Sequence, residues 1–315
     1  MSKKSQITLA IGADIGGSHI SCAAVDMTTH TILDHTHASI DVDNKADATT
    51  IIRSWCNAIQ QTLEKSGVEI PAGIGLAMPG PFDYVNGIAL FEGVGKFDHL
   101  NGVNVAEEMQ KRLAFPDPVP VRFMNDATSF GVGAVWLEPE LTSRNVLALT
   151  LGTGFGSAFI IDSLPVITDE RVPEMGCVYH LPYKDGIADD TFSTRGMIKA
   201  YKERSGNTVS GVKEIADRAG SDEHAADTLR EYGAGLSGFL APWVAKASIT
   251  DIIIGGNITR SYDLFRKPFE KGFRDKGLTV TVRISADTEQ MAILGSARLA
   301  EDTYYTRVKP LLAEM

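Results

Sequence analysis

The feature that most constrains this sequence is a strand–glycine turn–strand pattern that occurs twice. The first copy is "IGADIGGSHISCAAVD" at residues 11–26, and the second is "LALTLGTGFGSAFIID" at residues 147–162. Glycines let the backbone reverse sharply and expose its N–H groups at close range. Successive exposed N–H groups form a concave site for an anion such as phosphate. The repetition therefore predicts two related α/β halves, each opening with a hairpin that can hold an anion.

Hydrophobic periodicity around these hairpins predicts alternating strands and helices, which is typical of the α/β class. Strands are expected at 7–13, 19–26, 31–41, 73–80, 119–126, 249–258 and 278–285. Helices are expected at 47–66, 103–113, 127–137, 191–204, 211–219, 222–247, from about 261 onward, and at 288–305. One segment, "GAGLSG" at 233–238, has the spacing of a dinucleotide-binding turn. Because it follows no strand and lies in a helical pattern, it indicates close helix packing instead.

Composition excludes several classes of function. The formal net charge is -10, which disfavours nucleic acid as a partner because phosphate contacts dominate that affinity. Three scattered cysteines without a CxxC motif are typical of a reducing cytoplasm. No run approaches the roughly 18 apolar residues of a membrane span, and "MSKKSQITLA" is too short and weakly apolar for a signal peptide. We expect a cytoplasmic protein with no membrane partner.

Acidic residues follow two of the expected strands. Asp14 lies beside the first glycine pair, an arrangement that makes sense only if a cation separates the carboxylate from a bound phosphate. Asn125 and Asp126 lie at a strand-to-helix junction, where ligands of open α/β sheets collect. Helix capping explains one residue of this pair. The other can act as a general base that accepts the proton of a sugar hydroxyl.

Five segments, in this order, resemble the ROK family (repressor, open reading frame, kinase) of bacterial sugar kinases. They are "IGADIGGSHISCAAVD", "GIGLAMPGPFDYVNGI", "FMNDATSFGVGAV", "LALTLGTGFGSAFIID" and "ITDIIIGGNITRS", and they cover nearly the whole chain. The resemblance implies an actin-like, hexokinase-type (ribonuclease H-like) fold with two α/β lobes around a central cleft. The small lobe is expected at 1–125 plus 290–315, and the large lobe at 126–289. ATP, Mg²⁺, a sugar acceptor and a homodimer are implied as well.

The resemblance also implies roles for single residues. Asp126 matches the general base, Asn125 and Glu174 match sugar-contacting residues, and Asp14 matches the carboxylate near Mg²⁺, which it reaches through phosphate or water. The expected nucleotide contacts are Gly16, Gly17, Ser18, Gly152, Thr153, Gly154, Gly255, Gly256 and Asn257.

The segment after Glu174 departs from the family pattern. Cys177 stands where the family usually has a histidine, and the Cys-rich zinc motif that follows is missing. A structural zinc site needs four nitrogen or sulfur ligands, and Cys177 with His180 supplies two at most. We therefore expect no structural zinc. Asp189 takes the place of the family's second sugar-binding glutamate, and His180 is a candidate to replace the missing histidine at the sugar.

Two other functions compete with a sugar kinase. A sugar-sensing regulator of this family carries an N-terminal DNA-binding domain, but only about a dozen residues precede Asp14 here, and small domains need about 50 or more. An actin-like ATPase or an acetate-type kinase would keep the fold and change the acceptor. The polar side chains of Asn125, Asp126 and Glu174 suit a polyhydroxylated acceptor, which favours a sugar kinase over an actin-like ATPase or an acetate-type kinase.

Overall fold

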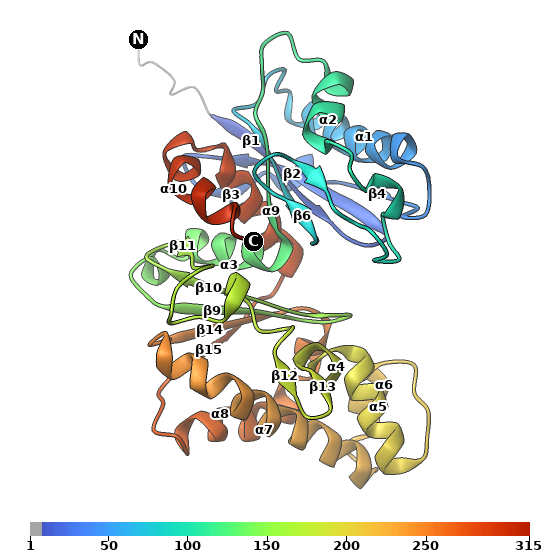
Figure 1. The fold of residues 1–315 in the computed structure, drawn as a ribbon, viewed down its shortest axis with the longest axis vertical. Coiled ribbons are helices and arrows are strands. Elements are labelled where there is room, and N and C mark those ends of the chain that lie inside the picture. The colour runs from blue at the N-terminus through green and yellow to red at the C-terminus, as the bar shows by residue number, and fades with distance from the viewer. Residues whose placement is uncertain (1–7) are drawn as a thin grey trace. The chain divides into compact units, whose positions relative to one another are not determined.

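The computed structural model describes residues 8–315 and divides into two compact units (Figure 1). The first contains the chain up to Thr142 together with Ser163–Pro165 and Glu289–Met315, and the second contains Ser143–Asp162 and Val166–Thr288. The border lies after Thr142 and not after residue 125 as expected from the sequence. The reason is that helix α3 (Asp126–Leu137) packs tightly within the first unit.

A sheet in the order β3-β2-β1-β5-β8 forms the centre of the first unit. Its antiparallel hairpin of β1 and β2 is followed by the parallel pairs β1–β5 and β5–β8. The bounds of its strands are β1 Leu9–Ile15, β2 His19–Asp26, β3 Thr31–Ile32, β5 Ile74–Met78 and β8 Val121–Asn125, with β4 Ala38–Asp41 paired to β2. A separate two-stranded ribbon consists of β6 Phe82–Asp83 and β7 Ile88–Ala89. The strand expected over 31–41 is interrupted by a 3-10 turn at Asp34–Thr36, where the Thr36 hydroxyl accepts the Ala24 N–H.

Helices cover this sheet. They are α1 Ala48–Ser66, α2 Val105–Leu113, α3 Asp126–Leu137, α9 Thr288–Ala297 and α10 Asp302–Leu312. Asp47 and Asn104 cap α1 and α2 at their N-termini, and α1 ends at Gly67 in the left-handed conformation, as the sequence signals predict. The single helix expected over 288–305 is two helices, because a 3-10 turn at Arg298–Ala300 separates α9 from α10.

Helix α9 approaches the sheet so closely that only glycine fits on the facing strands. Gly12 and Gly75 are register partners on β1 and β5. A Cβ atom on Gly12 would lie 2.0 Å from the carbonyl oxygen of Ile293, and one on Gly75 would lie 1.8 Å from that of Ser296. Helix α3 meets α9 in the same way, with a Cβ on Gly133 falling 1.9 Å from the Met291 oxygen. Backbone-to-backbone contact therefore holds α9 against β1, which carries Asp14, and against β5, and it holds α3 against α9.

Replacing one of these glycines is expected to cost stability. Gly75→Ala should lower the free energy of unfolding by about 1–3 kcal/mol, because the added methyl group overpacks a contact made by backbone. Urea unfolding would measure the change. Gly238→Ala is the control, since a Cβ at that helical position meets nothing within 4 Å. A Gly75→Ala protein as stable as this control would contradict the packing argument.

The second unit repeats the strand succession of the first. Its sheet has the order β11-β10-β9-β14-β15. The bounds are β9 Val146–Leu151, β10 Phe155–Ile161, β11 Leu164–Pro165, β14 Asp251–Gly255 and β15 Thr281–Ile284. Strands β9 and β10 are antiparallel, whereas β9–β14 and β14–β15 are parallel. The two halves predicted from the repeated hairpin are thus confirmed.

Helices and a short ribbon complete the second unit. They are β12 Pro182–Tyr183, β13 Gly186–Ile187, α4 Ala188–Phe192, α5 Thr194–Ser205, α6 Val212–Arg218, α7 Glu223–Lys246 and α8 Tyr262–Arg274. The expected helix 191–204 is split at Ser193. Within "GAGLSG", Gly233 lets α7 and α8 meet closely, since a Cβ there would lie 2.5 Å from the Phe265 oxygen. This confirms the predicted helix packing. Within residues 8–315, no helix is both long and apolar enough to cross a membrane.

Candidate active site

The first unit gathers the predicted catalytic residues at one edge of its sheet. Strands β1, β5 and β8 are parallel, and in their register Asp14 faces Ala77 while Met78 faces Asn125. The first glycine turn (Gly16–Ser18) directly follows β1. Because all of these residues lie at the carboxyl ends of parallel strands, they occupy the edge where α/β sheets bind ligands.

The structure decides which residue of the Asn125–Asp126 pair caps the helix. Asn125 is the N-cap of α3, and its Oδ1 accepts the N–H groups of Ala127 at 3.1 Å and Thr128 at 3.3 Å. Its Nδ2 donates to the Tyr84 hydroxyl at 3.4 Å. Asp126 is therefore not needed as the cap, and its carboxylate accepts the adjacent Ala127 N–H at 2.8 Å.

The carboxylates at this edge are poorly solvated and repel one another. Burial away from water raises the pKa of Asp14 to about 8, and repulsion by the negative charges of Asp126 and Glu289 adds to this rise. Partial loss of contact with water also raises the pKa of Asp126. The hydrogen bond from the Ala127 N–H and the positive charge of Lys96 oppose that rise. The side chain of Asp126 nevertheless reaches solvent, so it can meet an incoming hydroxyl group. A raised pKa brings a carboxylate closer to the range in which a general base works well.

Glu289 and Lys96 are site residues that sequence reasoning missed. Glu289 lies in the first turn of α9, and its carboxylate contacts His19 Nε2 at 3.3 Å and His37 Nε2 at 3.4 Å. It stands 275 positions after Asp14 along the chain (289 − 14), and only its place at a helix start marks it. Lys96 is a single cation in the glycine-rich "EGVGK", a signal too weak to have been used.

The Asp14 carboxylate suits a divalent cation that takes its other ligands from water and phosphate. Burial and the negative charges of Asp126 and Glu289 raise the pKa of Asp14, and a bound cation would favour its charged form. Mg²⁺ binds carboxylate oxygens while keeping several waters or phosphate oxygens. In the part of the chain that the structure describes, no group of three or more His, Cys, Asp or Glu side chains forms a metal cage. Mg²⁺ at Asp14 would therefore depend on water and phosphate for most of its ligands.

Both glycine turns offer free backbone donors. Over residues 8–315, the N–H groups of Gly17 and Ser18 have no hydrogen-bond acceptor, and the Gly16 N–H is used by His19 O at 2.9 Å. The same holds for Thr153 and Gly154 in the second glycine turn (Gly152–Phe155), which is closed by a bond from Gly152 N to Gly154 O at 3.0 Å. Such free donors suit phosphate oxygens.

A third predicted turn lies beside the second glycine turn in the second unit. Strands β9 and β14 are neighbours, with Thr150 opposite Gly255. Gly256 has a φ of 90°, and a Cβ there would lie 2.3 Å from the Leu151 oxygen. Only glycine fits this position, whose N–H donates to Thr288 Oγ1 at 2.7 Å. Asn257 then begins a 3-10 helix (Asn257–Ser261). The predicted nucleotide contacts of the second unit therefore share one sheet edge.

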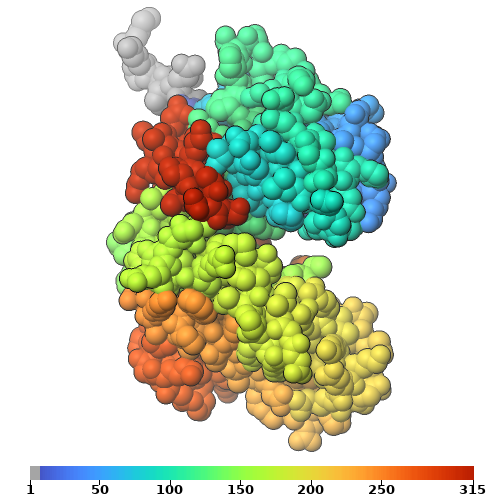
Figure 2. All heavy atoms as spheres, in the orientation of Figure 1, coloured from blue at the N-terminus to red at the C-terminus, as the bar shows by residue number. Residues whose placement is uncertain are grey.

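Two of the three predicted sugar contacts of the second unit, Glu174 and His180, bound a stretch that we call the acceptor segment (Glu174–His180), among the yellow-green spheres of Figure 2. Glu174 is exposed in a 3-10 turn. Cys177 Sγ lies 3.8 Å from His180 Nδ1, and burial raises the pKa of the Cys177 thiol to about 12. The thiol is thus protonated at neutral pH. The absence of a structural zinc stays a prediction.

Asp189 has other partners than the predicted sugar contact. Its Oδ1 accepts the Phe155 N–H of the second glycine turn at 2.6 Å, and its Oδ2 accepts a hydrogen bond from Arg195. Arg195 is a further residue that sequence reasoning missed, although it directly follows the start of α5.

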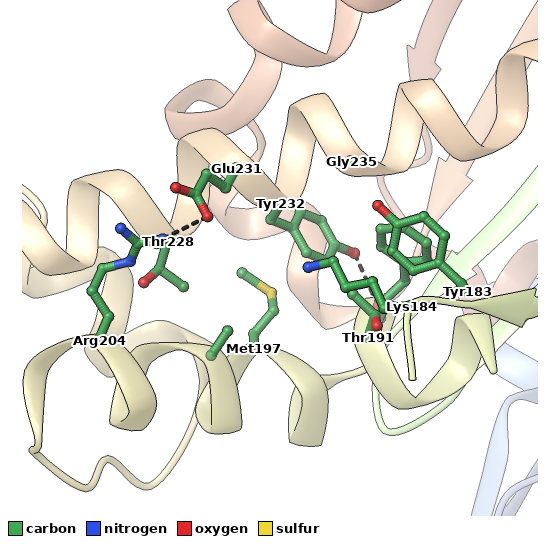
Figure 3. Close-up of a pocket in the computed structure, with 11 residues that line it drawn as sticks. Tyr183, Lys184, Thr191, Met197, Arg204, Thr228, Glu231, Tyr232 and Gly235 are labelled. Atoms are coloured by element: carbon green, nitrogen blue, oxygen red, sulfur yellow. Dashed lines mark hydrogen bonds and ion pairs between the residues drawn. The ribbon is translucent and has the colours of Figure 1, made fainter. Parts of the chain in front are cut away.

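A small cavity lies elsewhere in the second unit (Figure 3). Tyr183 and Lys184 enter it from the β12–β13 hairpin, Met197 and Arg204 from α5, and Glu231 from α7. Its volume of about 50 Å³ is well below the roughly 300 Å³ at which ligand pockets begin. None of the predicted site residues lines it.

Two units of the same α/β topology, each with glycine turns at the carboxyl edge of its sheet, define the actin-like two-domain fold of ROK hexokinases. A solved ROK family glucokinase from Streptomyces griseus, in complex with glucose and AMPPNP, shares this fold with a TM-score of 0.71 at 22% identity. The match covers 92% of this chain and 98% of that one. The ROK family model matches residues 10–303. The chain belongs to the ROK family.

Curated relatives of the chain are sugar kinases. A glucokinase from Thermotoga maritima is 24% identical over 319 aligned positions, covering 93% of this chain and 97% of the relative. An N-acetyl-D-glucosamine kinase from Vibrio cholerae is 21% identical, covering 82% of this chain and 87% of the relative. Both relatives are named as kinases of a hexose or of an N-acetyl-amino sugar.

Proposed function

We propose that this protein transfers the γ-phosphoryl group of ATP to a hydroxyl of a hexose or an N-acetyl-amino sugar, with Asp126 as the general base. The observation that carries the proposal is the geometry at the start of α3. Asn125 caps the helix, which leaves the Asp126 carboxylate accessible to solvent beside Asp14. A capping role alone would not require a second acidic residue at this edge.

The proposed chemistry needs one proton acceptor and one aligned phosphoryl group. The sugar hydroxyl oxygen forms a bond to the γ-phosphorus while the bond to the oxygen of the ADP leaving group breaks. The hydroxyl proton moves to the Asp126 carboxylate. Such a transfer depends mainly on alignment and charge neutralisation. Mg²⁺ supplies that neutralisation when bound, and Asp14 is the residue that would hold it.

The remaining predicted residues take binding roles in this proposal. The free N–H groups of Gly17, Ser18, Thr153 and Gly154 are assigned to ATP phosphates. The turn at Gly255–Asn257 is assigned to the adenosine. Asn125, through its amide nitrogen, and Glu174 and His180 are assigned to the sugar. A homodimer in the cytoplasm without nucleic-acid partners is part of the same proposal, and analytical ultracentrifugation tests the dimer.

ADP release across a sugar panel tests the function. The panel contains glucose, fructose, mannose, allose, glucosamine, N-acetylglucosamine and N-acetylmannosamine. We expect ADP release that depends on Mg²⁺ and on one or a few of these sugars, because a hydrogen-bonding acceptor site discriminates strongly between hydroxyl patterns. ADP release that no sugar changes would favour an actin-like ATPase. Sugar binding without ADP release would favour a regulator.

A further inference from the structure

One short segment of the second unit holds both arms of the second glycine turn. On one arm, the Gly152 carbonyl accepts the Thr194 N–H at 2.8 Å and the Thr194 hydroxyl at 2.9 Å. On the other arm, the Phe155 N–H donates to Asp189 Oδ1 at 2.6 Å. Residues 189–195 thus form hydrogen bonds with both arms of the turn, although they lie more than 30 positions away from it along the chain.

Asp189 is itself held in place. Its second carboxylate oxygen accepts a hydrogen bond from the Arg195 guanidinium, which also reaches Asp190 Oδ1 at 3.1 Å. The side chain of Asp189 is only 16% exposed, whereas that of Arg195 is 57% exposed. Both carboxylate oxygens of Asp189 therefore already accept a hydrogen bond from the protein. These bonds orient the carboxylate toward the turn.

The hydrogen bonds at Gly152 and Phe155 affect how the N–H groups between them are oriented for a phosphate group. The Phe155 N–H lies at the first residue of β10, where a side chain satisfies it. The N–H groups of Thr153 and Gly154, which lie between Gly152 and Phe155, have no hydrogen-bond acceptor among the described residues. Donors that are fixed in place before binding cost less entropy when the ligand arrives than donors on a mobile loop. Holding both arms therefore pre-orients the two donors.

The same segment is joined to the acceptor segment by backbone bonds. The Asp189 N–H donates to Tyr179 O at 3.0 Å, and the Ala188 N–H donates to Leu181 O at 2.9 Å. Nearer the acceptor residues, the Val178 N–H donates to Ser157 Oγ at 2.9 Å. The backbone of Asp189 is thus held by the residue Tyr179.

We infer that Asp189 and Arg195 are positioning residues of the nucleotide site and that Asp189 does not contact the sugar. Asp189 acts through the Phe155 N–H, and Arg195 acts through Asp189. The inference rests on the proposed kinase function for its kinetic consequence. The hydrogen bonds from Arg195 to Asp189 and from the Phe155 N–H to Asp189, which we call the brace, are present in the protein without substrates.

Two measurements on the same variants test the inference. Amide hydrogen exchange of the substrate-free protein follows the peptide 150–158, and steady-state kinetics give KM for ATP and for the best sugar of the panel. Asp189→Ala is expected to speed exchange at Phe155 and to raise KM for ATP about ten-fold, because a charged hydrogen bond is lost. KM for the sugar should stay within about two-fold. Asp189→Asn, which keeps one acceptor oxygen, should recover part of both effects, and Arg195→Lys should exceed Arg195→Ala in activity.

Asp169→Ala is the matched control. Asp169 also accepts a backbone N–H and pairs with an arginine, in both cases Arg171 at 2.8 Å, but it does not touch the second glycine turn. Neither the exchange of peptide 150–158 nor KM for ATP should change in this variant.

The outcomes separate the inference from the proposed function. Unchanged exchange in Asp189→Ala would overturn the brace. A rise in KM for the sugar with KM for ATP unchanged would identify Asp189 as a sugar contact, against the inference. A loss confined to Arg195→Ala would mean that the guanidinium binds the nucleotide directly. Faster exchange in a protein that releases no ADP with any sugar would support the brace and contradict the kinase.

Discussion

Asp126→Asn is expected to lower kcat by about 10²–10⁴-fold, the usual contribution of a positioned general base. An amide cannot accept the hydroxyl proton, yet it has nearly the same shape as the carboxylate and can still accept the Ala127 N–H. KM for ATP should therefore change little. The fold should not be weakened either, because a raised pKa means that the folded protein disfavours the charged form of Asp126, and the substitution removes that charge.

The measurement is ADP release with the preferred sugar, together with a thermal unfolding curve of each protein. Asp117→Asn is the control, since Asp117 is an exposed loop residue of the same unit. Full activity in Asp126→Asn would rule out Asp126 as the base. A loss of activity accompanied by unfolding would instead point to a structural role.

Asp14→Asn is expected to stabilise the substrate-free protein and to abolish activity. The pKa of Asp14 is about 8 in the folded protein and near 3.8 in the unfolded chain. Between these values the unfolded state has released the proton while the folded state retains it. Stability that is fully present below about pH 4 is therefore lost progressively as the pH rises toward 8. Asparagine has no such proton, so the variant escapes this loss.

Urea unfolding of wild type and Asp14→Asn between pH 5 and pH 9 measures the effect. The difference in unfolding free energy should grow with pH and then level off above about pH 8, reaching on the order of a few kcal/mol. Activity should fall at every pH, because an amide gives Mg²⁺ no charge compensation. Parallel pH profiles of the two proteins would show that the Asp14 carboxyl group is not perturbed.

The fold class, the two related halves and the identity of the three glycine turns follow from local patterns. A glycine that must adopt a φ of 90°, such as Gly256, or an apolar strand beside a turn is encoded within about ten residues. The same is true of the N-caps Asp47 and Asn104. The Asn125–Asp126 pair was recognised as one cap and one functional carboxylate, but either order was compatible with the sequence. The backbone at Asn125, with its side chain folded back onto Ala127 and Thr128, decided it.

What depends on distant segments could not be derived in this way. Asp189 was predicted as a sugar contact from its match to a family glutamate, and no local pattern indicates the bond that its carboxylate accepts from the Phe155 N–H. Glu289 joins Asp14 and Asp126 only because α9 packs onto glycines of β1 and β5. Turn and strand preferences arise from the conformational energy of a few neighbouring residues, so they can be derived from the chain alone. The partners of Asp189 and Glu289 arise from how remote elements pack, and only the tertiary structure decides them.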